Sequence, residues 1–208
     1  LGIEINEGDK EMYAKSVRHT IGYNPRSLKR YLNSFSLINH LREIEADENA
    51  QQDDDYMLFS ILGIQISYPQ IFRLLSQNPN YLSWDKAFAS KFGIDWDDVQ
   101  EKIQKYGESE LIDEEWEQVV WGACQKDSYL KSRAFSLLEL LNLLRDRYKE
   151  TLEEEIENAM TFASITSVDD DVETKQAVQK VGNKTIFDGV QTKLTQLQEE
   201  QFPEQAVS

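Results

Sequence analysis

The sequence is poor in several features that would fix the class of the protein at once. Cys124 is the single cysteine among 208 residues, so no disulfide forms within the chain and a reducing compartment is expected. No apolar run approaches the ~20 residues that a membrane-spanning helix needs, and neither end carries an apolar signal segment. We therefore expect a cytoplasmic protein without a membrane span. Leu1 in place of Met fits a segment of a longer protein.

Residues that support catalysis or bind metals are also few. The two histidines, His19 and His40, stand outside any H-x-x-x-H or C-x-x-C spacing, so a zinc site is not expected. Cys124 is expected to be a small buried apolar residue rather than a nucleophile. Glu139 has no catalytic partner near it in the sequence. The run 53–55 is three aspartates without the spacing and glycine of a calcium loop. We predict neither a catalytic nor a metal site in this chain.

Positive charge is scarce overall but concentrated in one segment. The chain has 22 Lys and Arg against 38 Asp and Glu, a formal net charge of −16, which argues against binding nucleic acid or anionic lipid over a large surface. Between Met12 and Arg42, however, there are six Lys or Arg residues and no acid. A partner that carries phosphate is therefore expected to bind there.

Strand patterns are nearly absent, and this predicts the fold class. No alternating β-branched run occurs between residues 8 and 160, whereas apolar residues recur there at steps of three and four. We expect an all-α, irregular multi-helix bundle of about eight helices over residues 8–162, with a poorly ordered or peripheral C-terminal segment. Strands are expected only near the termini, in residues 1–7 and around Gly182 in the segment 164–184.

The composition divides the chain into four regions. We predict a lid-like helical hairpin at 1–46, an acidic linker at 47–55, a helical core at 56–162, and a flexible segment with a terminal amphipathic helix at 163–208. The linker prediction depends on residues 45–55, which carry six acids and no bulky apolar group.

Within the core region, the helix at 56–66 is apolar nearly all round and is expected to be central. Pro69 should end it. The most regular later helix is predicted at 134–148, and it either continues into 150–162 or bends before that segment. The residues predicted to be buried together are Leu58, Ile61, Leu62, Phe88, Trp116, Leu137, Leu141 and Leu144.

The clearest helix start lies in the basic segment. Asn24 can cap the helix through its side-chain oxygen, and Pro25 suits the first helical position because that position needs no N–H. The apolar stripe is predicted to be Leu28, Leu32, Phe35 and Ile38, and the opposite face Arg26, Lys29, Arg30 and Asn33.

Three cations at the start of this helix oppose its dipole, which costs about 0.3–1 kcal/mol for each exposed charge. Helix stability therefore does not explain Arg26, Lys29 and Arg30. Free backbone N–H groups together with these side chains suit an anion such as phosphate or carboxylate. The competing interpretation is that they are the solvated face of an ordinary amphipathic helix.

The segment Asn24-Pro25-Arg26-Ser27-Leu28-Lys29-Arg30-Tyr31-Leu32-Asn33 resembles the NPR-x-x-KR-x-x-N helix that follows the nucleotide-binding core of KAP-type P-loop NTPases and, more loosely, the sensor-2 helix of AAA+ and STAND ATPases. The resemblance implies a nucleotide-phosphate sensing role for Arg26, with Lys29 and Arg30 as further candidates. This chain has no G-x-x-x-x-G-K-[ST] motif and no Walker B strand, so it would not hydrolyse ATP alone. ATP and Mg²⁺ would bind the core of the full-length protein.

Three hypotheses for function remain at this stage. The first is a C-terminal helical lid or regulatory domain of a KAP- or AAA+-like ATPase, with the ATPase core as its partner. The second is a free-standing acidic helical module that binds another protein chain. The third is a small regulator that contacts nucleic acid through residues 12–42, and it predicts steeply salt-dependent binding.

Overall fold

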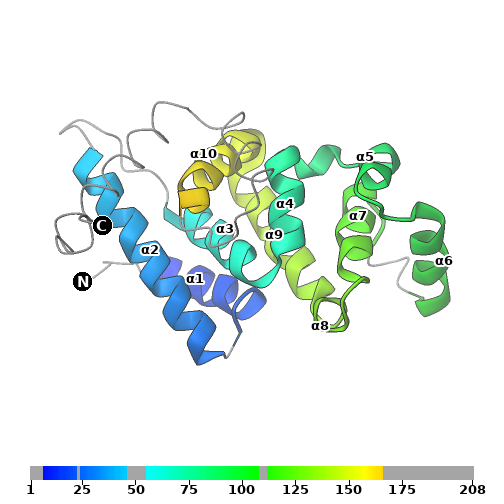
Figure 1. Cartoon of the computed structure of the whole chain (residues 1–208), viewed down its shortest axis with the longest axis horizontal. Helices are drawn as coiled ribbons and strands as arrows, with labels where there is room; N and C mark the ends of the chain where they lie inside the picture. The colour runs from blue at the N-terminus through cyan, green and yellow to red at the C-terminus, as the bar shows by residue number, and fades with distance from the viewer. Residues whose placement is uncertain (1–6, 23, 46–54, 108–111, 166–208) are drawn as a thin grey trace, which may run out of the picture.

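A computed structural model describes residues 7–22, 24–45, 55–107 and 112–165, and these residues form an all-α protein without any strand (Figure 1). The α-helices are α1 (Glu7–His19), α2 (Pro25–Glu45), α3 (Asp55–Ser67), α4 (Pro69–Gln77), α5 (Lys86–Lys91), α6 (Trp96–Tyr106), α7 (Glu115–Cys124), α8 (Ser128–Lys131), α9 (Ala134–Tyr148) and α10 (Leu152–Ile165). Short 3-10 turns, η1 (Tyr81–Ser83) and η2 (Lys149–Thr151), precede α5 and α10. The predicted all-α bundle is confirmed.

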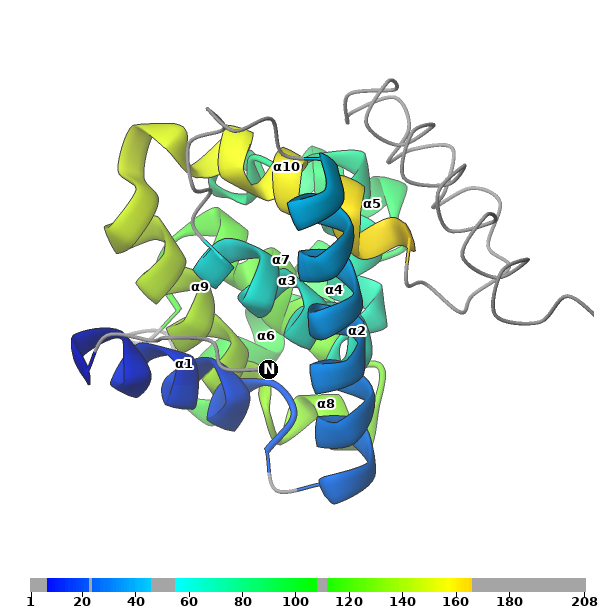
Figure 2. The same cartoon turned by 90° about the vertical axis from the view of Figure 1, so that its left-hand side faces the viewer.

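Helix α3 lies at the centre, as its all-round apolar sequence predicts. Every residue from 56 to 64 that bears a side chain is buried, because α1, α2, α4 and α10 each pack against α3 (Figures 1 and 2). The Phe59 ring meets the rings of Tyr13, Tyr31 and Phe35 edge to face, with centroids 4.6–5.1 Å apart. The hairpin of α1 and α2 therefore shares one hydrophobic core with the region from α3 onwards.

Local signals place the breaks between the helices that follow. Pro69 is the first residue of α4, and α3 ends two residues before it, at Ser67. Asp95 begins α6, where its carboxylate accepts hydrogen bonds from the N–H groups of Asp97 and Asp98 at 3.1 and 3.2 Å. Gly93 adopts a φ of 65°, which a residue with a side chain rarely does. After these breaks, α5, α6 and α7 lie at the end of the molecule opposite α2 (Figure 1).

Helices α9 and α10 are separate elements. The helix predicted at 134–148 therefore does not continue into 150–162, and the chain bends before that segment. Lys149 has a φ of 47°, the one positive φ of a non-glycine residue in the described ranges, and η2 follows it. The chain turns there and α10 returns along α3 (Figure 2), where the Gln65 side-chain amide donates to the Ala163 carbonyl at 2.9 Å.

The predicted core is confirmed: all eight residues that the sequence indicated are buried in one cluster. One assignment in the predicted stripe of α2 is wrong. Phe35 and Ile38 are buried as predicted, whereas Leu32 is 46% exposed and Tyr31 is buried in its place. On α9, Phe135 is 38% exposed.

Some predictions lie partly or wholly outside the described residues. These are the strands at 1–7 and 164–184, the acidic linker at 47–55, and the amphipathic helix within 163–208. The division of the chain into four regions therefore stays a prediction. Across the described part of the chain, no helix is both long enough and apolar enough to cross a bilayer.

Candidate functional site: the basic start of helix α2

The start of α2 forms as its sequence predicts. The Asn24 side-chain oxygen accepts hydrogen bonds from the Arg26 and Ser27 N–H groups at 3.1 and 3.3 Å, and Pro25 takes the first helical position. The Asn24 carbonyl accepts the first helical bond, from Leu28 N–H, at 2.9 Å. Two of the N–H groups expected to face an anion are thus already bonded. An anion at this helix start meets the basic side chains rather than those amides.

Arg26, Lys29 and Arg30 are all exposed, as expected for the outer face of α2. Within the described ranges, none of the three side chains makes a hydrogen bond or an ion pair. The acidic segment at 47–55 lies outside the described residues up to Asp54. Arg26 is exposed on the face that the sequence predicted, and its role in phosphate sensing stays a prediction. We refer to these three residues as the basic turn.

The opposite face of α2 holds the basic turn in place. The Tyr31 hydroxyl donates to the Phe59 carbonyl of α3 at 2.6 Å, and the Tyr31 ring meets the Phe59 ring at 4.6 Å. Burial raises the pKa of Tyr31 well above its ordinary value, so this phenol stays protonated and remains a donor. A helix fixed by aromatic contacts and a buried hydrogen bond presents its outer side chains from a constant position.

The expectation that Glu139 has no partner needs a correction. His19, at the end of α1, lies with Nδ1 3.4 Å from Oε2 of Glu139 on α9, so Glu139 does have a titratable partner. Burial lowers the pKa of His19, although the Glu139 carboxylate acts in the opposite direction. In the described part of the chain, no hydroxyl or thiol is bonded to either side chain, which leaves the pair without a nucleophile to activate.

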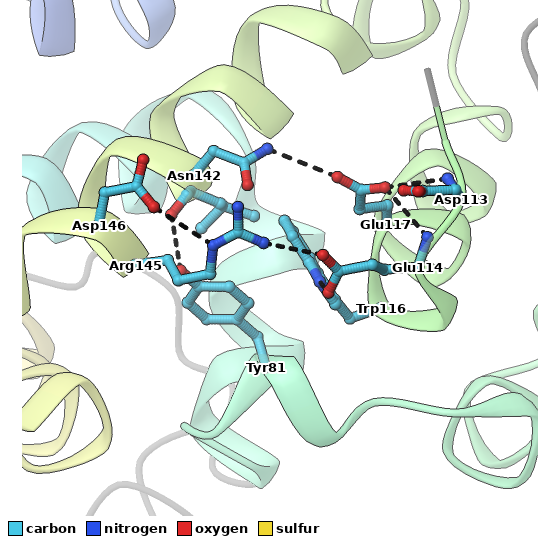
Figure 3. A network of polar contacts seen from close by, with 9 residues as sticks. Tyr81, Asp113, Glu114, Trp116, Glu117, Asn142, Arg145 and Asp146 are labelled. Carbon is cyan, nitrogen blue, oxygen red and sulfur yellow. Dashed lines mark hydrogen bonds and ion pairs between the residues drawn. The ribbon is translucent and has the colours of Figure 1, made fainter. Parts of the chain in front are cut away.

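A network of polar contacts joins the start of α7 to α9 (Figure 3). The Glu114 carboxylate accepts from Arg145 Nη1 at 3.0 Å through one oxygen and from the Trp116 indole N–H at 2.6 Å through the other. The Glu117 carboxylate accepts from the Asp113 and Glu114 N–H groups at 3.1 and 3.2 Å. The bond from Glu114 N–H is the one by which the third residue of a capping box reaches back to the residue that begins the helix. Because both acids are occupied by internal donors, the network is structural.

Cys124 and the surface hollows offer no site of their own. Cys124 is fully buried on α7, and burial raises the pKa of its thiol to about 12, as expected for a packing residue. One hollow of ≈ 60 Å³ is lined by Gln70, Arg73, Leu74, Phe92, Ile94, Ala123 and Lys126. That volume suits about two water molecules and is far too small for a nucleotide. Among the residues that the structure describes, no cluster of three His, Cys, Asp or Glu side chains is placed to hold a metal ion.

Comparisons of the chain with protein-family models, with curated proteins and with solved structures each found no match.

Proposed function

We propose that this chain is the helical region that follows the nucleotide-binding core of a KAP-type or AAA+-like P-loop ATPase. In this proposal Arg26 contacts a phosphate of the nucleotide held by the core, and Lys29 and Arg30 contribute positive charge beside it. The chain supplies a lid or regulatory element rather than an active site. ATP and Mg²⁺ belong to the core, because the residues described here fit the end of a polyphosphate and not a whole nucleotide.

The observation that carries the proposal is the unpaired state of the basic turn in a strongly acidic protein. With 38 acids against 22 Lys and Arg, carboxylate partners are abundant. Arg145, Lys102 and Lys15 each have one, at 3.0, 2.7 and 3.1 Å. The three cations of the basic turn have none within the described residues, although each opposes the helix dipole. An unpaired guanidinium on a fixed helix is suited to a charged ligand that arrives from outside.

The chemistry follows from the shape of the guanidinium. Arginine presents several N–H donors in one plane, so Arg26 can donate two parallel hydrogen bonds to a phosphate, whereas a lysine acts as a point charge. Such a contact is made when the phosphate is present and lost when it leaves. The position of α2 would then depend on whether the phosphate is bound, and the helices packed against α2 would respond to that change.

The test uses the full-length protein that contains this chain. Its gene should encode a Walker A motif before residue 1. Arg26→Ala should lower the rate of ATP hydrolysis about 100- to 1,000-fold, as for loss of a donor to a developing charge. Arg26→Lys should hydrolyse ATP at a rate between those of the parent and Arg26→Ala, because lysine keeps the positive charge but lacks the planar guanidinium.

The matched control is Lys105→Ala, which removes one exposed cation from the last turn of α6. It should leave hydrolysis unchanged. Thermal unfolding of the Arg26→Ala chain should match that of the parent, because an exposed unpaired side chain contributes little to stability. Equal ATPase rates for Arg26→Ala and the parent would rule out the proposal.

A second function, an interaction module, is favoured by one specific observation. Leu32 and Leu37 are 46% and 38% exposed on α2, the helix that bears the basic turn. In this alternative, the exposed leucines and the unpaired cations of α2 would contact another protein chain. The same experiment separates the two functions, because a docking module tolerates Arg26→Ala without any change in nucleotide hydrolysis.

A further inference from the structure

The carboxyl end of α1, just before the basic turn, is held by residues distant in the sequence. Within the helix end itself, the Ser16 carbonyl accepts from Thr20 and the Val17 carbonyl accepts from Gly22 N–H at 2.8 Å. Among the described residues, no local N–H group donates to the last two carbonyls, those of Arg18 and His19. Here they accept from side chains that follow α3 and α8.

Arg133, the residue just before α9, supplies the first of these side chains. Its Nη2 lies 3.5 Å from the Arg18 carbonyl and 3.3 Å from the His19 carbonyl. Its Nη1 donates to the Tyr129 hydroxyl at 2.6 Å. The guanidinium also lies over the rings of Tyr68 and Tyr129, at 5.5 and 5.3 Å from their centroids. A cation at the negative end of a helix dipole is favourable, and two aromatic rings fix its orientation.

Tyr68 supplies the second side chain. It is fully buried at the junction of α3 and α4, and its hydroxyl donates to the His19 carbonyl at 2.6 Å. Burial raises the pKa of this phenol, so it stays protonated and remains a donor near neutral pH. Tyr68 and Arg133 thus meet on one carbonyl oxygen, that of His19.

The chain from His19 to the basic turn is short. Gly22 adopts a φ of 63°, and a Cβ built there would lie 3.7 Å from Arg133 Nη2, its nearest neighbour. Asn24, two residues later, already caps α2. Because so few residues separate the clamped carbonyls from Arg26, the direction in which the chain leaves α1 decides where α2 begins.

We propose that Arg133 and Tyr68 are positioning residues for the basic turn, which fix the turn between α1 and α2 and thereby the approach of Arg26 to a phosphate. The inference rests on the proposed function for its ligand. It adds that Tyr68, just before α4, and Arg133, just before α9, fix the position of the basic turn without touching the ligand.

The test compares two tyrosines that make the same bond in different places. Tyr68→Phe removes the hydroxyl bonded to His19, whereas Tyr81→Phe removes a buried hydroxyl that donates to the Leu141 carbonyl at the same 2.6 Å. Both variants should lose similar global stability. Only Tyr68→Phe should speed hydrogen exchange at the amides of Arg26, Ser27 and Leu28. Arg133→Lys should do the same, because lysine keeps the charge but cannot bridge both carbonyls and Tyr129.

The functional arm uses inorganic tripolyphosphate as the probe, titrated into the 208-residue chain. Arg26→Ala should abolish binding, Tyr81→Phe should leave it unchanged, and Tyr68→Phe and Arg133→Lys should weaken it about three- to tenfold, the effect of one lost hydrogen bond. An Arg133→Lys chain that binds as tightly as the parent would mean that Arg133 acts only through its charge, and would overturn its positioning role.

The two proposals fail in different ways. If the parent does not bind tripolyphosphate, or if Arg26→Ala binds it equally well, the proposed phosphate contact is wrong and the exchange data alone decide the positioning role. If the three amides exchange at the same rate in Tyr68→Phe and Tyr81→Phe, the positioning inference is wrong whatever the binding result.

Discussion

At the scale of single residues, buried tyrosines connect segments that are distant in the chain. Tyr31, Tyr68 and Tyr81 are fully buried, and each hydroxyl donates to a backbone carbonyl at 2.6 Å. Burial raises the pKa of all three, so none ionises near neutral pH. Each phenol satisfies a carbonyl while its ring fills the core. The three bonds hold α2 on α3, the end of α1 on α4, and η1 on α9.

His19 gives a residue-scale prediction about pH. Its pKa in the folded protein lies below the 6.5 of the free side chain, because burial favours the neutral ring. In the window between these two pKa values the unfolded chain binds more protons, so the free energy of unfolding rises with pH. The contribution of neutral His19 to the free energy of unfolding is fully present above pH 6.5, and it is lost as the pH falls through the pKa of His19 in the folded protein.

The measurement is urea unfolding from about pH 5 to pH 7.5, the range in which histidine titrates. His19→Gln should flatten the rise in stability with pH. Glu139→Gln should steepen it, because the carboxylate 3.4 Å away counteracts the effect of burial. Identical pH profiles for His19→Gln and the parent would show that His19 does not cause the dependence.

At the scale of helices, close approach between α1 and α3 depends on one glycine. Gly63 lies in the middle of α3, where a Cβ would come within 2.6–3.0 Å of the Thr20 Oγ1, Cβ and Cγ2 atoms. Thr20 is itself buried and bonded to the Ser16 carbonyl at 2.6 Å, so it has little room to move. The absent side chain lets the end of α1 lie directly on α3, beside the turn into α2.

Gly63→Ala is therefore expected to destabilise the protein, although alanine is the better helix former. Overpacking of this kind costs about 1–3 kcal/mol, against a gain of at most ~1 kcal/mol from helix propensity. Urea unfolding of the variant gives the net change. The loss should be smaller in a Thr20→Ala background, where two of the three clashing atoms are gone. A stabilised Gly63→Ala protein would mean that α1 and α3 separate easily.

At the scale of the whole molecule, one core joins elements from both ends of the described chain. Tyr31 and Phe35 of α2 belong to the same buried cluster as Leu141 of α9 and Ile156 of α10. Helix α2, which belongs to the hairpin predicted at 1–46, is thus packed on the same core as the later helices. Charge is distributed differently: the basic segment lies at the α2 end, and acids line the first turns of α6, α7 and α10.

A shared core predicts cooperative unfolding. The four tryptophans all lie between residues 84 and 121, whereas far-ultraviolet circular dichroism reports every helix. The two signals should change together in urea, because α1 and α2 cannot leave α3 without exposing the core. Leu141→Ala should lower the free energy of unfolding by about 2–5 kcal/mol and shift both signals equally.

The control is Leu82→Ala, which removes a side chain that is 38% exposed in η1 and should cost much less. Two separate transitions, with only the tryptophan signal moved by Leu141→Ala, would show that the hairpin is an independent unit.

Features that depend on neighbouring residues could be predicted from the sequence. Asn24 caps its helix as predicted, Pro69 lies at the break after α3 as expected, and the segment 134–148 is the helix α9. The position of the basic turn belongs to this group, because a cap and a helical period place its three cations on one side. These signals act within one or two turns, so tertiary contacts do not override them.

Contacts between residues from distant segments could not be predicted from local patterns in the sequence. The buried stripe of α2 passes through Tyr31 rather than Leu32, because a tyrosine hydroxyl finds the Phe59 carbonyl in the core. Arg133 reaches the end of α1 across 114 positions, and no local pattern could indicate it. Sequence periodicity specifies which side of a helix is apolar to within about one residue, whereas pairing between helices depends on how all their surfaces fit at once.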